Sequence, residues 1–243
     1  MINSEEELLA VIMDKIGSKF PDNAILKGGM SLRLTSSPRG TNDLDYVFIP
    51  FKSKKKIVNM ILDALNEIPN VTTTHSLNSK CLRIIITSNN ISTQIEANVM
   101  EDCETSIITT QLISQKYGIA PKIIKIMRWD IALAHKMAAW AERRLIRDIY
   151  DIHYIFYILK EKPNMEILKK RLKNLSMSKN IKNQKKKLTL NEYSDEIELF
   201  VNDLTQNDID NELLGYLEKE HIAGINYIFK STISDLTKWL NEQ

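Results

Sequence analysis

A helix is predicted close to the N-terminus by the spacing of its apolar residues. Between residues 8 and 16, apolar side chains recur every three or four positions, and the pattern stops at Gly17. Ser4 and Glu7 match a capping box, in which the Ser4 hydroxyl and the Glu7 carboxylate satisfy free backbone amides at a helix start. The sequence therefore predicts a capped amphipathic helix in this region.

Short apolar runs after this helix predict a mixed sheet. Strands are expected over 24–27, 43–49, 71–75, 81–87 and 92–100, and helices over 31–34 and 54–67. Asn89 and Asn90 lie between the last two strands and indicate a hairpin, although no glycine strengthens that signal. The first part of the chain thus mixes α and β structure.

From Trp129 onward the pattern becomes almost wholly helical. Apolar residues recur at helical spacing over 130–137, 145–159, 165–175, 197–204 and 211–240. Turn residues at 118–121 separate the two patterns, so we expect an α+β chain with a mixed-sheet domain over 1–120 and a helical domain over 121–243. The polar, lysine-rich segment 174–187 is predicted to be a mobile linker within the helical half.

The composition is that of an ordinary soluble globular protein, with 43% hydrophobic and 26% charged residues. No run approaches the ~18 apolar residues that a membrane span requires, and the N-terminus lacks a basic cap followed by a cleavable apolar stretch. We therefore expect a cytoplasmic protein without membrane contact. Cys81 and Cys103 have no partner at zinc-ligand spacing, which predicts two small buried hydrophobes rather than a disulfide or a zinc site.

Charge is distributed unevenly, although the formal net charge is only +2. Residues 160–187 contain eleven Lys or Arg and two acidic residues, whereas the chain after Lys187 contains twelve Asp or Glu and three Lys. A basic stretch can attract phosphate backbones through counterion release, and it can equally be a solvated helix face and loop. Charge alone leaves both interpretations open.

A glycine pair and an acidic pair carry the clearest chemical signal. Gly28 and Gly29 directly follow the predicted strand that ends at Lys27, where paired glycines let the backbone approach a phosphate and amides at a helix start point at the anion. Asp43 and Asp45 lie two positions apart on the next strand, so their side chains project to the same face. Such a pair can hold Mg2+ or Mn2+ beneath a nucleoside triphosphate, as nucleotidyl transfer requires.

Neither pair is specific by itself. Asp208 and Asp210 repeat the acidic spacing without a preceding glycine pair or strand, and a glycine pair alone usually marks a turn. Thirteen residues separate Gly29 from Asp43, with a strand predicted on each side, and this conjunction favours catalysis. The alternative is a glycine turn beside a salt-bridged edge strand.

Motifs in both halves of the chain form one set. The first is Lys27-Gly28-Gly29-Met30-Ser31-Leu32-Arg33-Leu34, followed by Arg39 and by Asn42-Asp43-Leu44-Asp45. The second is Asp130-Ile131 with Lys136, followed by Arg147-Asp148 and Asp151. Together these motifs resemble the AbiEii/AbiGii family of nucleotidyltransferase toxins, within the polymerase-beta-like nucleotidyltransferase superfamily. The landmarks span residues 26–152, and the remainder matches only in being helical.

The resemblance implies roles for residues of the first motif. The implied triphosphate contacts are Lys27, Gly28, Gly29 and Ser31. Arg33 and Arg39 flank this pocket and can contact phosphates, although surface arginines need no such role. The superfamily usually has Ser or Thr directly after the glycines, whereas this chain has Met30, so either Ser31 supplies the hydroxyl or the backbone amides suffice. A third carboxylate is expected on a later strand, and Glu96 is the candidate because its neighbours Ile95 and Ala97 share the opposite face. An exposed glutamate on an amphipathic strand explains the same pattern.

The second motif supplies a lysine and two acids. Lys136 resembles the motif lysine that would neutralise triphosphate charge, and Asp148 or Asp151 is implied as a functional acid. A surface lysine with an apolar stem explains Lys136 without function. Arg144 with Asp148, and Arg147 with Asp151, have the i, i+4 spacing of helical ion pairs, which does not separate structure from catalysis.

These features predict a metal-dependent enzyme that transfers a nucleoside monophosphate from an NTP to an acceptor hydroxyl. By resemblance, the acceptor is RNA, for example the 3′ end of tRNA, and the protein is the toxin of a toxin–antitoxin or phage-defence system with a cognate antitoxin. Two alternatives remain. One is a nucleotidyltransferase that modifies a protein or a small molecule, and the other is a non-catalytic RNA-binding module in which the acidic pair is a relic.

Overall fold

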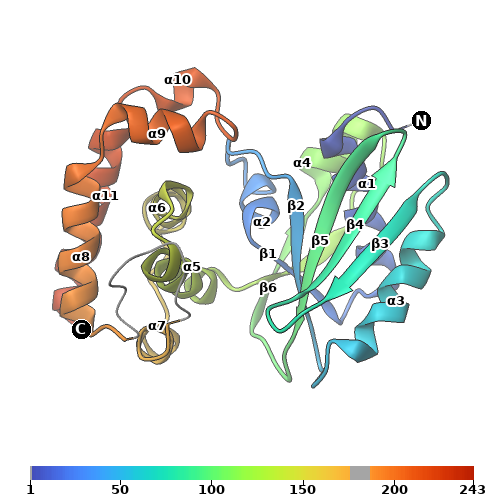
Figure 1. Ribbon diagram of the computed structural model, residues 1–243, viewed down its shortest axis with the longest axis horizontal. Coiled ribbons are helices and arrows are strands. Elements are labelled where there is room, and N and C mark those ends of the chain that lie inside the picture. The colour runs from blue at the N-terminus through green and yellow to red at the C-terminus, as the bar shows by residue number, and fades with distance from the viewer. Residues whose placement is uncertain (1, 176–186) are drawn as a thin grey trace. The chain divides into compact units, whose positions relative to one another are not determined.

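The computed structural model describes residues 2–175 and 187–243, which form two compact units (Figure 1). The first unit, Met1–Arg128, combines a sheet with helices. The described elements of the second unit, Trp129–Gln243, are all helices. The mixed α and β class predicted from the hydrophobic pattern is confirmed.

A seven-stranded mixed sheet organises the first unit. Its strands are β1 (Ala24–Lys27), β2 (Asp43–Phe48), β3 (Thr72–Leu77), β4 (Leu82–Ser88), β5 (Ile91–Val99), β6 (Thr105–Thr109) and β7 (Ile123–Met127). They lie in the order β3-β4-β5-β2-β1-β7-β6, with β1 antiparallel to β2 and β2 parallel to β5. The strands that carry the glycine and acidic motifs therefore lie in the middle of the sheet.

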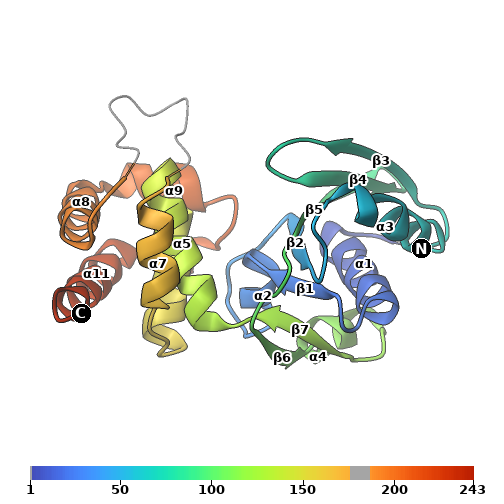
Figure 2. The same cartoon turned by 90° about the horizontal axis from the view of Figure 1, so that it is seen from below.

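Helices cover one face of this sheet. The helical segments of the unit are α1 (Glu5–Lys19), α2 (Gly29–Arg33), α3 (Lys55–Asn66), α4 (Gln111–Ser114) and the 3-10 helix η1 (Gln115–Tyr117). α1 packs against β5, β2 and α3, on the face where Ile84 and Ile95 are fully buried (Figure 2). Arg83 and Glu96, one position along their strands, project from the opposite face. That second face carries the polar residues of the site.

The second unit is a group of helices around an aromatic core. Its elements are α5 (Trp129–Arg143), α6 (Ile146–His153), the π-helix η2 (Tyr154–Ile158), α7 (Met165–Leu172), α8 (Leu190–Asp203), α9 (Gln206–Leu213), α10 (Lys219–Ile222) and α11 (Ile225–Asn241). α5 packs against α6 and α7, and α8 packs against α11. Trp140 and Tyr193 are fully buried and meet edge to face, with ring centroids 5.5 Å apart. None of the described helices is both long and apolar enough to cross a bilayer.

The structure contains two strands that apolar spacing did not predict. β6 pairs with β7, and β7 joins the sheet parallel to β1, so the first unit continues to Arg128 rather than ending near residue 120. The turn residues at 118–121 connect two parts of one unit, because the apolar run of β7 returns the chain to the sheet. The predicted linker over 174–187 falls mostly outside the described residues.

The N-terminal cap and the cysteines agree with the sequence predictions in part. Ser4 caps α1, and its hydroxyl accepts a hydrogen bond from the Glu7 amide at 3.1 Å. The Glu7 carboxylate accepts a hydrogen bond from the Asn3 amide at 2.7 Å, one residue earlier than a standard capping box requires. Cys81 and Cys103 are both free thiols, but only Cys81 is buried.

Candidate active site

The glycine turn after β1 lies against the acidic pair of β2. Gly28 has φ +76° and ψ −152°, a conformation that residues with a Cβ rarely adopt. A Cβ at Gly28 would lie 2.4 Å from Asp45 Oδ2, and a Cβ at Gly29 would lie 2.8 Å from Thr41 Oγ1. The first position therefore requires glycine for its conformation as well as for space, and the second requires it for space.

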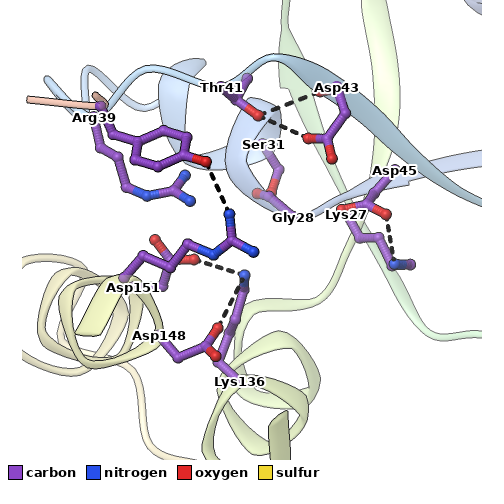
Figure 3. A network of polar contacts seen from close by, with 12 residues as sticks. Lys27, Gly28, Ser31, Arg39, Thr41, Asp43, Asp45, Lys136, Asp148 and Asp151 are labelled. Atoms are coloured by element: carbon purple, nitrogen blue, oxygen red, sulfur yellow. Dashed lines mark hydrogen bonds and ion pairs between the residues drawn. The ribbon is translucent and has the colours of Figure 1, made fainter. Parts of the chain in front are cut away.

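Asp43 and Asp45 project from the same face of β2 because they are two residues apart. Thr41 Oγ1 donates a hydrogen bond to Asp43 Oδ1 at 3.0 Å, and Lys27 Nζ lies 3.3 Å from Asp45 Oδ1 (Figure 3). The Asp45 side chain keeps 25% of its surface exposed. Each carboxylate is thus oriented by a neighbouring donor, and water or ions can reach the pair.

Glu96 lies in register beside Asp45, on the parallel neighbour β5. Its carboxylate is held from the other side by Arg83 on β4, whose Nη2 and Nε donate to Glu96 Oε1 at 2.6 and 3.1 Å. This hydrogen bonding, together with charge attraction, raises the pKa of the Arg83 guanidinium. In the part of the chain that the structure describes, no three His, Cys, Asp or Glu side chains gather to hold a metal ion. The sheet therefore places Glu96 next to the acidic pair but leaves its carboxylate on Arg83.

The acidic pair by itself has donors that suit a hard divalent cation. Mg2+ prefers oxygen ligands and commonly uses one or two protein carboxylates together with waters and substrate phosphates. The glycine turn lies directly against Asp45 Oδ2, since a Cβ at Gly28 would come within 2.4 Å of that oxygen. Asp43 and Asp45 therefore fit a metal that is shared with a bound phosphate better than one enclosed by protein ligands.

The remaining predicted triphosphate contacts do not all lie at the glycine turn. Ser31 is buried there, and its hydroxyl donates to the Gly28 carbonyl at 2.7 Å. Arg39 is also buried, and a Cβ at Gly29 would lie 2.7 Å from its Nη1. Arg33 is directed to α1, where its Nε and Nη2 donate to Glu6 Oε1 at 3.3 and 3.2 Å. Ser31 thus closes the turn, and Arg33 fastens α2 to the first helix.

The second unit holds a buried cluster of charged side chains on α5 and α6. Lys136 Nζ lies 2.6 Å from Asp151 Oδ2 and 3.8 Å from Asp148 Oδ1 (Figure 3). Arg143 binds Asp148 through two hydrogen bonds, both of 2.6 Å. Both aspartate side chains are 0% exposed, whereas Lys136 keeps 18% exposure. Cations therefore compensate both buried carboxylates, as burial requires.

The helical i, i+4 spacing did not identify the partners in this cluster. Arg144 has φ +55° and interrupts the helix between α5 and α6, so it does not lie one helical turn before Asp148. Its guanidinium pairs with Glu196 instead. Arg147 donates to the Tyr216 hydroxyl at 3.0 Å. For Arg144 and Asp148, the spacing argument assumed a continuous helix, and the break at Arg144 removes that assumption.

A protein-family model matches residues 12–223, and the family is described as the nucleotidyl transferase AbiEii toxin of type IV toxin–antitoxin systems. The chain belongs to the AbiEii family. The matched range includes the glycine turn, the acidic pair and the buried cluster of α5 and α6. The resemblance inferred from the sequence motifs is confirmed, and family membership supports an enzyme.

Solved structures share the fold of this AbiEii chain at low sequence identity. JHP933 from Helicobacter pylori has a TM-score of 0.59 and 14% identity, over 100% of this chain and 96% of that chain. MenT4, a nucleotidyltransferase toxin from Mycobacterium tuberculosis H37Rv, has a TM-score of 0.57 and 14% identity, over 96% of this chain and 84% of that chain. A comparison with curated proteins gave no match. The fold is therefore that of a nucleotidyltransferase.

Three residues that orient charged groups of this AbiEii chain were missed by the sequence motifs, namely Thr41, Arg83 and Arg143. The predicted hairpin at Asn89 and Asn90 is sufficient to predict the partner of Arg83. If Asn89 and Asn90 form a two-residue turn, residues equidistant from it pair, which brings Arg83 opposite Glu96. Thr41 lies in a loop, and Arg143 precedes a helix break, so neither position has a period that predicts its partner.

Proposed function

We propose that this AbiEii chain transfers a nucleoside monophosphate from an NTP to a hydroxyl group of an RNA acceptor, with release of pyrophosphate. The observation that supports this most directly is the contact between the glycine turn and the acidic pair, where a Cβ at Gly28 would lie 2.4 Å from Asp45 Oδ2. A phosphate that approached the backbone of this turn would meet a cation bound to the carboxylates.

In this proposal Asp43 and Asp45 hold Mg2+ or Mn2+. Bound metal supplies charge neutralisation for the triphosphate and activates the attacking hydroxyl. Thr41 keeps Asp43 oriented, and Lys27 occupies Asp45 Oδ1 at 3.3 Å until a phosphate attracts its ammonium group. The amides of Gly28 and Gly29 then bind the phosphates, because the Ser31 hydroxyl is committed to the Gly28 carbonyl. Arg39 adds positive charge beside the same turn.

Glu96 is the proposed third carboxylate. Its in-register position beside Asp45 supports this role. The carboxylate would exchange at least part of its contact with Arg83 for the metal or for the proton of the acceptor hydroxyl. Such an exchange is feasible because the Glu96 side chain is partly exposed to solvent.

Lys136 is the proposed cation for triphosphate charge in the second unit. Its side chain keeps 18% exposure beside two aspartates that are fully buried. Asp151 and Asp148 fix its ammonium group from the buried side. We therefore assign the aspartates to orientation of the lysine and the lysine to phosphate contact.

The choice of RNA as acceptor is supported by exposed positive charge. Lys169, Lys170, Lys173 and Lys187 are exposed in the second unit. Arg171 of the same stretch is engaged with His135 and Glu142, so its role is structural. In the proposal the enzyme acts in the cytoplasm, where NTPs and RNA are present, and a cognate antitoxin restrains it.

The test is a transfer assay with purified protein, Mg2+, each labelled NTP in turn and total tRNA. A variant with Asp43→Asn and Asp45→Asn should lose at least ~100-fold in rate, because metal-derived stabilisation is worth several kcal/mol. Asp208→Asn with Asp210→Asn is the matched control, since it removes the same acidic spacing from α9. The control should retain wild-type activity.

Each outcome of this assay discriminates between functions. Label in RNA that requires metal and Asp43 with Asp45 supports the proposal. Label that appears in a protein or a small molecule instead identifies a nucleotidyltransferase with a different acceptor. RNA binding without any NTP turnover, in wild type as in the variant, would identify a non-catalytic binding module and refute the proposal.

A further inference from the structure

The surface that follows α6 presents an aromatic ring and an apolar side chain to solvent. Tyr157 is 44% exposed and Ile158 is also exposed, although both lie in the π-helix η2 directly after a buried helix. The Leu159 amide donates to the Tyr154 carbonyl at 2.9 Å, which is the i to i+5 bond of a π-turn. π-turns are frequent at functional sites, so this surface is a candidate for recognition.

Tyr157 is supported from beneath by a rigid aromatic base. Its ring stacks on His153, with centroids 5.6 Å apart and planes inclined by 20°. His153 Nδ1 and the Thr232 hydroxyl are hydrogen-bonded at 2.7 Å, which fixes the imidazole between α6 and α11. Burial, with a contribution from Lys160, lowers the pKa of His153 to about 4. The imidazole is therefore neutral at pH 7 and serves as a flat, uncharged support.

Two exposed lysines, Lys160 and Lys162, follow Tyr157 in the chain. Lys160 Nζ lies 4.1 Å from the centroid of the Tyr157 ring. Lys162 Nζ lies 4.0 Å from the Phe156 ring and 5.6 Å from the Trp239 ring. The two lysines are themselves exposed, and cation–π contacts of exposed ammonium groups are weak. Each ammonium group can therefore leave its ring for a stronger anionic partner.

An exposed aromatic ring with exposed lysines close to it in the chain matches the requirements of a single-stranded nucleic acid. Stacking of a base on a tyrosine is sequence-tolerant, and lysines beside the ring can neutralise the adjoining phosphates. A base in a duplex cannot reach such a ring without leaving its stack. The charges also favour this partner over an apolar protein surface, because burial against protein would leave both lysines without counter-charges.

We propose that Tyr157, with Lys160 and Lys162, forms a stacking platform for an unpaired base of the RNA acceptor. This inference rests on the proposed function for the identity of the RNA as substrate, but the binding event requires neither NTP nor metal. When a base stacks on Tyr157, Lys160 moves from the ring to a neighbouring phosphate. Lys160 and Lys162 therefore contact the nucleic acid directly, beside a base. The other lysines of the basic stretch 160–187 supply only long-range attraction.

The platform is tested with a fluorescein-labelled single-stranded RNA of about 12 nucleotides, a length within the usual range of single-strand sites. Binding is measured by anisotropy in EDTA, without NTP. Tyr157→Ala should raise the Kd about tenfold, as the loss of one stacked base predicts, whereas Tyr157→Phe keeps the ring and should leave the Kd within about twofold. Tyr227→Ala is the matched control, since Tyr227 is 75% exposed on α11.

The lysines are tested through the salt dependence of binding. Lys160→Met with Lys162→Met should reduce the slope of log Kd against log salt by roughly 1.4, because each phosphate neutralised on a single strand contributes roughly 0.7. Lys55→Met with Lys56→Met, both exposed on α3, is the charge-matched control and should leave the slope unchanged. A slope that falls equally in both double variants would overturn the role of these two lysines.

The outcomes keep the platform and the proposed function apart. Equal Kd values for wild type and Tyr157→Ala, or equal losses in Tyr157→Ala and Tyr227→Ala, would overturn the platform. Binding that depends on Tyr157 without any label transfer to RNA would support the platform and refute RNA as the acceptor. Transfer to RNA with the same KM in wild type and Tyr157→Ala would support the proposed function and refute the platform.

Discussion

The carboxylates of the two charged sites differ in solvent exposure and in how tightly cations hold them. On β2, Asp45 keeps 25% exposure and has Lys27 Nζ at 3.3 Å. On α6, Asp148 is 0% exposed and receives two hydrogen bonds of 2.6 Å from Arg143. A carboxylate that keeps its hydration can exchange partners, whereas a buried carboxylate depends on its fixed cation. The first arrangement suits ligand binding, and the second suits the positioning of Lys136.

The same contrast extends to the arginines that hold these carboxylates. Arg83 donates twice to Glu96 at the sheet surface, and Arg143 donates twice to Asp148 in the helical unit. Arg143 uses both oxygens of Asp148, with each hydrogen bond at 2.6 Å, whereas Arg83 uses only Oε1 of Glu96, at 2.6 and 3.1 Å. Solvent exposure distinguishes them, because water screens one pair and is excluded from the carboxylate of the other.

The largest expected effect comes from removing the buried pair. Arg143→Met should lower the free energy of unfolding by about 3 kcal/mol, at the low end for a broken buried pair because Lys136 remains 3.8 Å from Asp148. Arg83→Met is the matched variant and should cost less than ~1 kcal/mol. Urea denaturation of both variants measures the difference. Equal losses would show that burial does not distinguish the two sites.

A second expected effect concerns acid sensitivity of the helical unit. Burial, followed by the charge of Lys160, lowers the pKa of His153 to about 4 from its ordinary value of 6.5. A histidine that is neutral when folded binds fewer protons than the unfolded chain, so its stabilisation is present above pH 6.5 and is lost as the pH falls toward 4. The loss across this window should be about 3 kcal/mol.

Urea denaturation at a series of pH values between 7 and 4 measures this effect. His153→Phe keeps an aromatic ring under Tyr157 and removes the titrating group, so its stability should vary less with pH in this window. His75→Gln changes an exposed histidine on β3 and should keep the wild-type dependence. If His153→Phe and wild type showed the same slope, burial of the imidazole would not explain the acid sensitivity.

The sequence predicts features that depend on neighbouring residues better than features that depend on residues far apart in the chain. The glycine turn and the acidic pair were predictable, because a φ of +76° at Gly28 and the common face of Asp43 and Asp45 follow from local rules. β7 was not predicted, because its position beside β1 depends on pairing between residues about one hundred positions apart. Periodicity identifies elements, and it does not determine which distant strand they join.

The partners of charged residues were harder to predict than the residues themselves. Asp148, Asp151 and Lys136 were candidates from the motifs, but the role of Arg143 depends on where α5 ends. The positive φ of Arg144 decides that end, and no glycine or proline at this position announces it. The ring contacts of Tyr157 likewise depend on a π-turn that apolar spacing does not reveal.

A third effect tests why the glycine turn of the exposed site contains Gly28. Gly28→Ala should cost about 2 kcal/mol, because a Cβ is disfavoured at φ +76° and ψ −152° and would also contact the Asp45 carboxylate. Gly118→Ala is the matched control, since Gly118 has φ +66° and open space where a Cβ would lie, and it should cost about 1 kcal/mol. Thermal and urea unfolding give the comparison, and equal costs would argue against the close contact with Asp45.

The smallest expected effect concerns Glu6, a partly exposed carboxylate on α1 that contacts residues of α2 and η1. Burial tends to raise the pKa of Glu6, but hydrogen bonds from Lys116 and Tyr117 and the charges of Lys116 and Arg33 outweigh it and lower the pKa below 4.5. A carboxyl group whose pKa is lower in the folded than in the unfolded chain stabilises the fold at pH values above the unfolded pKa. This stabilisation is lost as the pH falls through the folded pKa.

Glu6→Gln should therefore destabilise the chain at pH 7 by at most about 1 kcal/mol, since solvent screens a partly exposed group. Its difference from wild type should shrink only as the pH falls below 4.5, whereas the loss from His153 begins already at pH 6.5. If the two variants instead changed the pH dependence in the same window, the two units would not have the separate acid responses that their burial implies.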